Sequence, residues 1–421
     1  MNNQPTIRPR RATATASEIA QLQIEHSAEV SRRAELAGRS ILRLFGKRAF
    51  HMPDTLICAI QTPETRTRTT RISDWHFWWQ AHLLDCAIDA SLRAHREYNS
   101  QNATEWFENA QKILRGIHTR NFGLWTNSYY DDMAWLVLAA GRLNALATLL
   151  HGRGYMPAQD AGHALFSALH KGRSLTKGGM YWSSKKDFRN TPATAPAALA
   201  FLRTQEPETA LDLINWLNNT LWDAERRVFL DGLRTVGSEE KLEEGIFSYN
   251  QGPILGALVE AAEDGHSLNV EISERIAEIL DGIEQHFAID FAVSDAEHIQ
   301  ILRTQGTGDA GLFTAILVRY LAQIALAESL TAEVRQKARD WVIQTAEILW
   351  DGRREFDPDL PLNEPGIDVT EIRGEPVVLF STDIARHSSE TLPPGTPVEL
   401  SCQLQGWMIQ EAAARVLAET L

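Results

Sequence analysis

The connections between apolar helical segments constrain the fold most strongly, because long and short connections alternate along the whole chain. Nearly every periodic segment has apolar residues at helical spacing, and convincing alternating strands are scarce. The sequence predicts about twelve helices, near 17–47, 73–97, 103–117, 129–150, 159–170, 191–204, 207–219, 247–264, 271–286, 308–328, 332–350 and 401–419. Short connections lie near 98–102, 151–158, 205–206, 265–270 and 329–331, and long ones near 48–72, 118–128, 171–190, 220–246, 287–307 and 351–400.

This alternation predicts an all-α (α/α)6 toroid, a closed double ring of inner and outer helices. In a ring of helical hairpins, alternate connections lie on opposite ends, so that all the long loops share one end. Functional residues are often found on loops held by a rigid scaffold. No Gly/Ser-rich linker or shift in composition divides the 421 residues. We therefore expect one domain over 1–421, with 1–16 as a flexible N-terminal tail.

The charge of the chain argues against some classes of partner. Lys and Arg together number 41 and Asp and Glu 55, so the net charge is −14. This excess of acid disfavours a nucleic-acid backbone or an anionic membrane surface as partner, whereas a neutral substrate is compatible with it. We also expect no membrane span, because no apolar stretch looks long enough for one.

The cysteine and histidine patterns indicate neither a disulfide framework nor a metal site. Cys58, Cys86 and Cys402 are far apart, and we interpret them as buried free thiols. His76 and His82 are six residues apart, which is not the spacing of a helical metal-binding pair. Phosphate loops and dinucleotide-binding fingerprints are also absent from the sequence. We expect neither a metal nor a cofactor.

The N-terminal segment suggests a cytoplasmic location. It contains Arg10-Arg11, but no hydrophobic segment of a twin-arginine signal follows. A secreted protein trimmed of its signal would have the same sequence.

The long loops are rich in Trp, Tyr, Asp and Asn, and these loops are expected to share one end of the ring. Sugars present C–H faces that stack on aromatic rings, and hydroxyl groups that need hydrogen-bond donors and acceptors. The composition of this end therefore favours a carbohydrate cleft over a purely hydrophobic pocket.

Two adjacent carboxylates, Asp131 and Asp132, lie at the expected start of the helix near 129–150. Ser128 and Asp131 fit the broad form of a capping box, and acids in a first helical turn interact well with the helix dipole. The alternative is glycoside hydrolysis, in which retaining enzymes need two carboxyl groups roughly 5–5.5 Å apart. Two such neighbours would also separate their pKa values, since nearby like charges disfavour double ionisation. Spacing alone does not decide between these interpretations, nor does it assign a role to either residue.

Several motifs resemble, in order, those of glycoside hydrolase family 76, the α-1,6-mannanases. The family is related to fungal cell-wall proteins that act on the mannan of GPI anchors. The resemblance covers roughly residues 70 to 325, and three positions, Arg189, Ser248 and Thr314, depart from residues common in the family. The matching motifs are Tyr130-Asp131-Asp132-Met133-Ala134-Trp135, Gly178-Gly179-x-Tyr181-Trp182, Asp187-Phe188-Arg189-Asn190, Tyr249-Asn250-Gln251-Gly252 and Val318-Arg319-Tyr320-Leu321.

The resemblance implies an (α/α)6 fold and retaining hydrolysis of α-1,6-mannosidic bonds, with mannan or a mannooligosaccharide as substrate. Carried over by position, Asp131 would be the nucleophile and Asp132 the general acid/base. From the matched motifs and the composition of the long loops, we expect sugar contacts from Trp78, Trp125, Tyr130, Trp182, Asp187, Asn190, Asp231, Tyr249, Asn250, Gln251 and Asp309.

Other activities of (α/α)6 rings remain open at this point. A sugar epimerase would need histidine bases, for which His76 is the one candidate in a suitable context. An unsaturated-uronide hydrolase would need a basic cleft, for which Arg189 and Arg303 are thin support. A non-catalytic sugar-binding protein would not need the acid pair. A transglycosylase would use that pair in the same way, because water and a sugar hydroxyl can resolve the same intermediate.

Overall fold

The computed structural model describes residues 16–64, 75–204, 206–294, 296–304, 306–357, 375–393 and 395–420. Apart from residue 16, the predicted N-terminal tail lies outside this part of the chain. All twelve predicted helices are present in it, with ends within a few residues of those expected.

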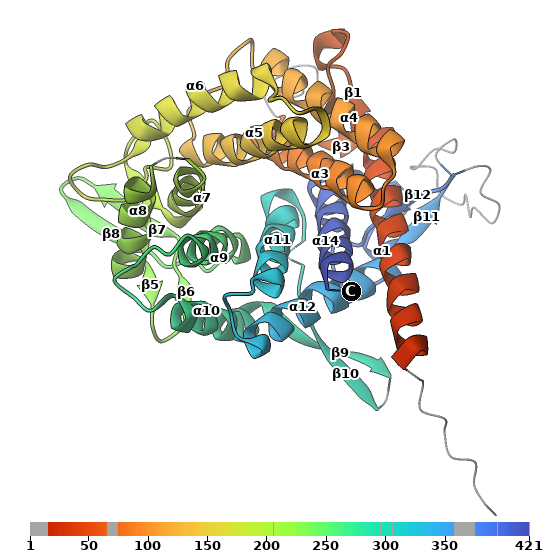
Figure 1. Cartoon of the computed structure of the whole chain (residues 1–421). Coiled ribbons are helices and arrows are strands. Elements are labelled where there is room, and N and C mark those ends of the chain that lie inside the picture. Colours follow the sequence, from red (N-terminus) through yellow and green to blue (C-terminus); the bar gives the residue numbers. More distant parts are fainter. Residues whose placement is uncertain are drawn as a thin grey trace, which may run out of the picture.

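The long helices form two concentric rings, which confirms the (α/α)6 toroid (Figure 1). Each inner helix packs against the next, and the last packs against the first, so the inner ring is closed. The inner helices are α3 (Phe77–Arg96), α5 (Tyr130–His151), α7 (Thr191–Leu202), α9 (Ser248–Glu263), α11 (Phe313–Leu326) and α14 (Leu400–Glu419). The outer helices are α1 (Ala16–Phe45), α4 (Ser100–Arg120), α6 (Met156–Gly172), α8 (Pro207–Thr220), α10 (Ile272–Phe287) and α12 (Ala332–Asp351).

The two rings differ in the distribution of their apolar residues. Every residue of the inner helix α7 is buried, and apolar residues lie all around it. The outer helix α10 is amphipathic instead: Ile272, Ile276, Ile279 and Ile283 recur at helical spacing and form its buried stripe. A helix that is apolar all round needs packing on every side, whereas one stripe suffices for a helix that faces solvent. The sequence therefore distinguishes inner from outer positions.

All six inner helices begin at the same end of the ring, because each follows a long connection. We call this end the mouth. The N-termini of helices carry the positive end of the helix dipole, so the mouth is favourable for carboxylates. The long loops that build it contain short elements that the sequence did not predict, among them η1 (Ala49–His51) and α13 (Ser388–Thr391). The segment predicted as a helix near 308–328 begins as the 3-10 helix η2 (Gly308–Leu312) and continues as α11.

Short antiparallel strands also occur in the long loops. Two hairpins are the largest: β7 (Gly232–Val236) with β8 (Glu239–Glu243), and β9 (Ala288–Ser294) with β10 (Glu297–Leu302). β4 (Phe188–Asn190) adds to the first of them and joins the third long loop to the fourth. The other pairs are β1 (Gly46–Lys47) with β2 (Ile57–Cys58), β3 (Gln61–Thr62) with β13 (Val398–Glu399), β5 (Trp222–Asp223) with β6 (Val228–Phe229) and β11 (Arg354–Phe356) with β12 (Val377–Leu379).

A glutamine in the first turn of three inner helices fixes the loops to the ring. In each case the side-chain amide accepts from a backbone N–H and donates to the C=O of the same residue, at 2.7–3.0 Å. These buried amide pairs satisfy backbone groups that would otherwise lack partners. The pairs are Gln80 with Cys58, Gln251 with Phe229, and Gln403 with Phe380.

Four charged side chains bridge the inner ring below the cleft. Asp85 and Asp89 of α3 each pair with Arg142 of α5 and with Arg319 of α11. The Arg319 contacts measure 3.0 and 2.8 Å. Because the two arginines come from different helices, this network ties three inner helices together. It also explains why the Val-Arg-Tyr-Leu motif carries a charge within an otherwise apolar helix.

Two inner segments, Tyr130–His151 and Gly308–Leu326, are long and apolar enough to cross a membrane by length and composition. The expectation that no stretch has the necessary length is therefore wrong on that criterion. In the most apolar window of each, 61% and 67% of the residues are buried inside the protein. Packing within the ring accounts for their apolar character. The three cysteines are free and buried, as predicted.

Candidate active site

A cleft of about 590 Å³ lies at the mouth of the ring. Its walls come from the segments that lead into α3, α5, α7, α9 and α11, which are five of the six inner helices. Six of the residues predicted from the sequence line it, namely Asp131, Asp132, Trp78, Trp182, Tyr249 and Asp309. Elements distant in sequence thus place the expected acids and aromatic rings around one cavity.

The acid pair projects from the first turn of α5. Tyr129 is the N-cap residue, and no side chain caps this helix, so the capping box suggested by Ser128 and Asp131 does not form. The N–H of Tyr130 instead donates to the C=O of Trp182 at 2.8 Å. The two carboxylates are therefore not used as caps and are free to face the cleft.

Asp131 has one carboxylate oxygen held and one without a partner. Its Oδ2 accepts a hydrogen bond of 2.9 Å from the indole Nε1 of Trp182. Its Oδ1 is buried and makes no hydrogen bond to any described residue. Burial raises the pKa of Asp131 to about 7, against the effect of the backbone N–H groups at the helix start and of the indole. An unpaired buried oxygen on a carboxylate is costly in a purely structural role.

Asp132 lies in a different environment from its neighbour. Its Oδ2 accepts a hydrogen bond of 2.5 Å from the side-chain amide of Asn127. Burial raises the pKa of Asp132 well above its usual value, and the charge of Asp131 raises it further. Because the two charges oppose each other, the pair retains a proton near neutral pH. Only Asp131 has the indole donor and the helix-start N–H groups, which favour the charge on that residue.

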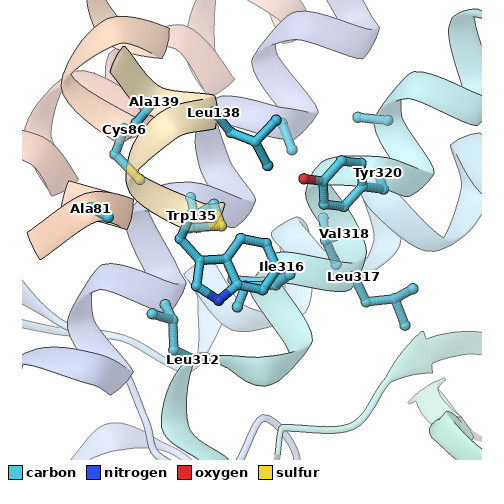
Figure 2. Close-up of a cluster of buried hydrophobic side chains, with 14 of the residues drawn as sticks. Ala81, Cys86, Trp135, Leu138, Ala139, Leu312, Ile316, Leu317, Val318 and Tyr320 are labelled. Carbon is cyan, nitrogen blue, oxygen red and sulfur yellow. The ribbon is translucent and has the colours of Figure 1, made fainter. Parts of the chain in front are cut away.

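Aromatic rings form the walls and floor of the cleft. Tyr249 stacks on Phe313 with ring centroids 4.0 Å apart, and Trp78 lies 6.4 Å from Phe313. Trp135 forms the floor one helical turn below Asp131 and is 5% exposed. Figure 2 shows its indole beside Ile316 and Leu312, so the floor rests directly on the hydrophobic core. The cleft thus offers rigid apolar faces next to the acid pair.

A histidine and a third carboxylate also line the cleft, His76 at the start of α3 and Asp309 just before α11. Nδ1 of His76 is 3.5 Å from Oδ1 of Asp309, and the imidazole stacks on Trp79 with centroids 4.1 Å apart. His76 has a φ of 46°, in the left-handed region. The negative charge of Asp309 raises the pKa of both Asp131 and Asp132. It therefore contributes to keeping the pair protonated.

Three residues that were expected to contact sugar instead make structural contacts within the protein, away from the cleft. Tyr130 is buried with its ring against Gly172, where an added Cβ would lie 2.5 Å from the ring. Asn190 caps α7 by accepting from the N–H of Ala193. Gln251 is fully buried in its amide pair with Phe229.

Four more expected contact residues do not line the cleft. Trp125 stacks on His118 with centroids 4.1 Å apart. Asp187 is half-buried, and its C=O accepts from the N–H of Thr235. Burial raises the pKa of Asp231 to about 6, although the neighbouring Asn250 amide acts to lower it. Asn250 is fully buried.

Several cleft residues were not predicted from the sequence. Asn127 and Tyr129 flank the acid pair, and Trp135 follows Asp131 by four residues, a spacing that places both on one helix face. That spacing was a usable signal. Phe313 gave no signal, because it opens an apolar helix and looks like a core residue. The other lining residues that were not expected to contact sugar are Trp75, His76, Phe77 and Ser128, of which His76 was considered only as the base of an epimerase.

A ring of helical hairpins with paired carboxylates and aromatic walls at its mouth is the architecture of an (α/α)6 carbohydrate-active enzyme. Comparison with known families identifies the class further. The model of Glycosyl hydrolase family 76 matches residues 55–357, and the chain belongs to this family of glycoside hydrolases. No curated protein gives a significant match.

Solved structures share the fold. The GH76A α-1,6-mannanase of Salegentibacter sp. HEL1_6 superposes with a TM-score of 0.69 at 24% identity, covering 92% of this chain and 99% of that one. The Lin0763 protein of Listeria innocua has a TM-score of 0.67 at 21% identity, covering 91% and 97% of the two chains. Dfg5 of Chaetomium thermophilum, solved with glucosamine, has a TM-score of 0.62 at 14% identity, covering 93% and 91%.

Proposed function

We propose that this glycoside hydrolase cleaves α-1,6-mannosidic linkages with retention of anomeric configuration. The observation that carries the proposal is the pair Asp131 and Asp132, which faces an aromatic cleft with a different hydrogen-bond donor on each carboxylate. The family assignment supports a glycosidase. The choice of linkage is supported by the similar Salegentibacter enzyme, which is an α-1,6-mannanase.

The environments of the two carboxylates favour a division of roles. The nucleophile must be ionised, and Asp131 is the carboxylate favoured as the anion by the Trp182 indole and the helix N-terminus. The general acid must carry a proton, and Asp132 is the carboxylate whose pKa its neighbour raises. We therefore assign Asp131 as nucleophile and Asp132 as general acid/base.

The reaction then takes two steps. In the first, a carboxylate oxygen of Asp131 bonds to the anomeric carbon, while Asp132 donates its proton to the departing glycosidic oxygen. In the second, Asp132 takes a proton from water, the water oxygen bonds to the anomeric carbon, and the bond to Asp131 breaks. Two inversions leave the product with the α configuration of the substrate.

The similar Salegentibacter mannanase supports a catalytic role for the pair as a whole. A variant of that protein with two consecutive aspartates replaced by asparagine is inactive and was solved with α-1,6-mannotriose. Loss of activity with retained binding is what removal of a catalytic pair produces.

The test is to replace each acid separately and to measure cleavage of α-1,6-mannooligosaccharides. Asp131→Asn and Asp132→Asn should each lower kcat by at least about a thousandfold, because each removes one half of the catalytic pair. Asp160→Asn, an exposed acid on α6, is the matched control and should leave kcat unchanged. Activity close to that of the parent in either cleft variant contradicts the assignment.

Two further readouts complete the mechanism. Proton NMR of the first-formed product should show the α-anomer, and a β-anomer contradicts retention. Chromatography at high concentrations of mannooligosaccharide acceptor should show products shorter than the substrate. Products longer than the substrate as the main species would indicate transglycosylation instead.

A further inference from the structure

We propose that Phe50 and Phe122 form a second carbohydrate-binding surface, outside the cleft, that holds distal mannosyl residues of the chain being cleaved. We call it the rim surface. The proposal rests on the function proposed above and extends it from the linkage that is cleaved to the length of substrate that is preferred.

The rim surface is set apart by its exposure. Only four aromatic side chains are exposed in the described part of the chain: Phe50, Tyr98, Phe122 and Tyr129. Phe122 is 74% exposed and Phe50 45%, and their ring centroids are 5.6 Å apart. Aromatic rings that are exposed to water forgo the stabilisation that burial in the core would give. Exposed apolar side chains that lie side by side often mark a binding site.

The backbone beneath both rings is strained. Phe50 has a φ of 47° and Phe122 a φ of 56°, and the left-handed region is unusual for a bulky side chain. Strain of this kind persists when the surrounding structure imposes it, and it is concentrated at ligand-binding positions. Phe122 adopts this conformation in the turn that ends α4, where the N–H of Gly123 donates to the C=O of His118 at 2.8 Å, and Phe50 adopts it within η1.

The rim surface is continuous with the cleft through a buried arginine. The guanidinium of Arg120 lies 5.2 Å from the ring centroid of Phe50 and 5.2 Å from that of Trp75. Trp75 lines the cleft. Arg120 is 5% exposed, so the stack of ring, guanidinium and ring is a fixed part of the wall. A chain leaving the cleft past Trp75 therefore reaches Phe50 and then Phe122.

The chemistry of the rim surface fits a neutral sugar. It presents aromatic faces, while the charge of Arg120 is buried between rings and the protein as a whole is acidic, with a net charge of −14. A polymer with more units than the cleft holds must leave the cleft, and stacking of its C–H faces on Phe122 would add affinity outside it. A short oligosaccharide would gain nothing from the rim surface.

The test is to compare one polymer and one short substrate in matched variants. Phe122→Asn removes the ring and keeps a residue that tolerates the left-handed conformation. Tyr98→Asn is the control, because Tyr98 is 97% exposed, has a φ of 58° and lies beyond the end of α3 that is remote from the mouth. Thermal melting of each variant reports whether the fold is intact, and Phe50→Asn gives a second, independent substitution.

We expect Phe122→Asn to lower kcat/KM for α-1,6-mannan by about three- to tenfold, and to leave kcat/KM for α-1,6-mannotriose unchanged. Tyr98→Asn should change neither value. The proposal is overturned if Phe122→Asn lowers kcat/KM equally for mannan and for mannotriose. It is also overturned if Phe122→Asn and Tyr98→Asn have the same kcat/KM for mannan. The rim surface is also overturned if the same variants leave mannan cleavage unchanged but bind more weakly to a second copy of this chain or to another protein.

The failure of this proposal is distinguishable from the failure of the proposed function. A parent enzyme that does not cleave mannotriose or mannan overturns the proposed function, and the rim surface as a mannan site with it. A parent enzyme that cleaves both, with variants that do not discriminate between them, overturns the rim surface alone.

Discussion

Trp182 binds the start of α5 twice: its indole N–H donates to the carboxylate of Asp131 at 2.9 Å, and its C=O accepts from the N–H of Tyr130 at 2.8 Å. The loop before α7 therefore fixes both the backbone and the side chain of the acid pair. This relationship explains how a short carboxylate at a helix end keeps one orientation without a cap. It also couples the electrostatics of Asp131 to a residue far away in sequence.

Replacing Trp182 by Phe keeps an aromatic ring and removes the indole donor. Because this hydrogen bond favours ionised Asp131, its loss should raise the pKa of Asp131. The acidic limb of the kcat/KM profile should then move to higher pH, and kcat should fall about ten- to a hundredfold. A pH profile measured on a mannooligosaccharide checks this, with thermal melting to show that the fold is intact. An acidic limb at its original position contradicts the coupling.

Asp309→Asn should shift the pH profile in the opposite direction. The charge of Asp309 raises the pKa of both members of the acid pair, so a neutral amide should lower both values. Both limbs of the kcat/KM profile should therefore move to lower pH, with the larger change on whichever carboxylate lies nearer. The exposed Asp290→Asn on β9 is the control and should leave both limbs in place. Limbs that stay in place in Asp309→Asn would show that solvent screens this charge.

The ring and the position of its mouth were predictable from the sequence because they depend on features that a chain carries locally. Helical spacing marks the twelve segments, and loop length marks the end where functional residues gather. The paired strands of two or three residues were not predicted, because so short a segment leaves no periodic pattern. Four of the five residues of β8 are charged, so the sequence of the β7–β8 hairpin resembles that of an exposed loop.

The candidate site was predictable only in part, because a residue at the start of an inner helix can face either the cleft or the wall of the ring. Tyr249 and Gln251 illustrate this: they are two positions apart in one motif, yet Tyr249 lines the cleft and Gln251 pairs with Phe229 inside the wall. Spacing does not reveal which side of the helix faces the axis. The side that faces the axis depends on how neighbouring helices pack, and for the same reason the sequence does not distinguish Phe313 from a core residue.

Gln251→Ala distinguishes the structural role of this residue from a role in sugar binding. The substitution leaves the buried N–H and C=O of Phe229 without their partner, at a cost of about 2–4 kcal/mol in the free energy of unfolding. KM for a mannooligosaccharide should not change, because the side chain is fully buried away from the cleft. Urea unfolding measures the loss of stability, and steady-state kinetics measure KM. Gln159→Ala, at an exposed position, is the control for both measurements. A raised KM with unchanged stability would restore the sugar-contact interpretation.

Arg319→Met should destabilise the ring in a pH-dependent way. Burial opposes the ionisation of Asp85, but the charges of Arg142 and Arg319 hold its pKa at about 2. A pKa below the unfolded value of about 3.9 means that ionised Asp85 contributes stability above that value, and that the contribution is lost as pH falls towards 2. Without Arg319 the pKa of Asp85 rises, so the variant should lose about 3–5 kcal/mol at pH 7 and less at pH 3. Urea unfolding at both pH values measures this difference, and the exposed Arg386→Met should lose little at either. An equal loss at both pH values would mean that Arg319 stabilises the ring by packing and not by its charge.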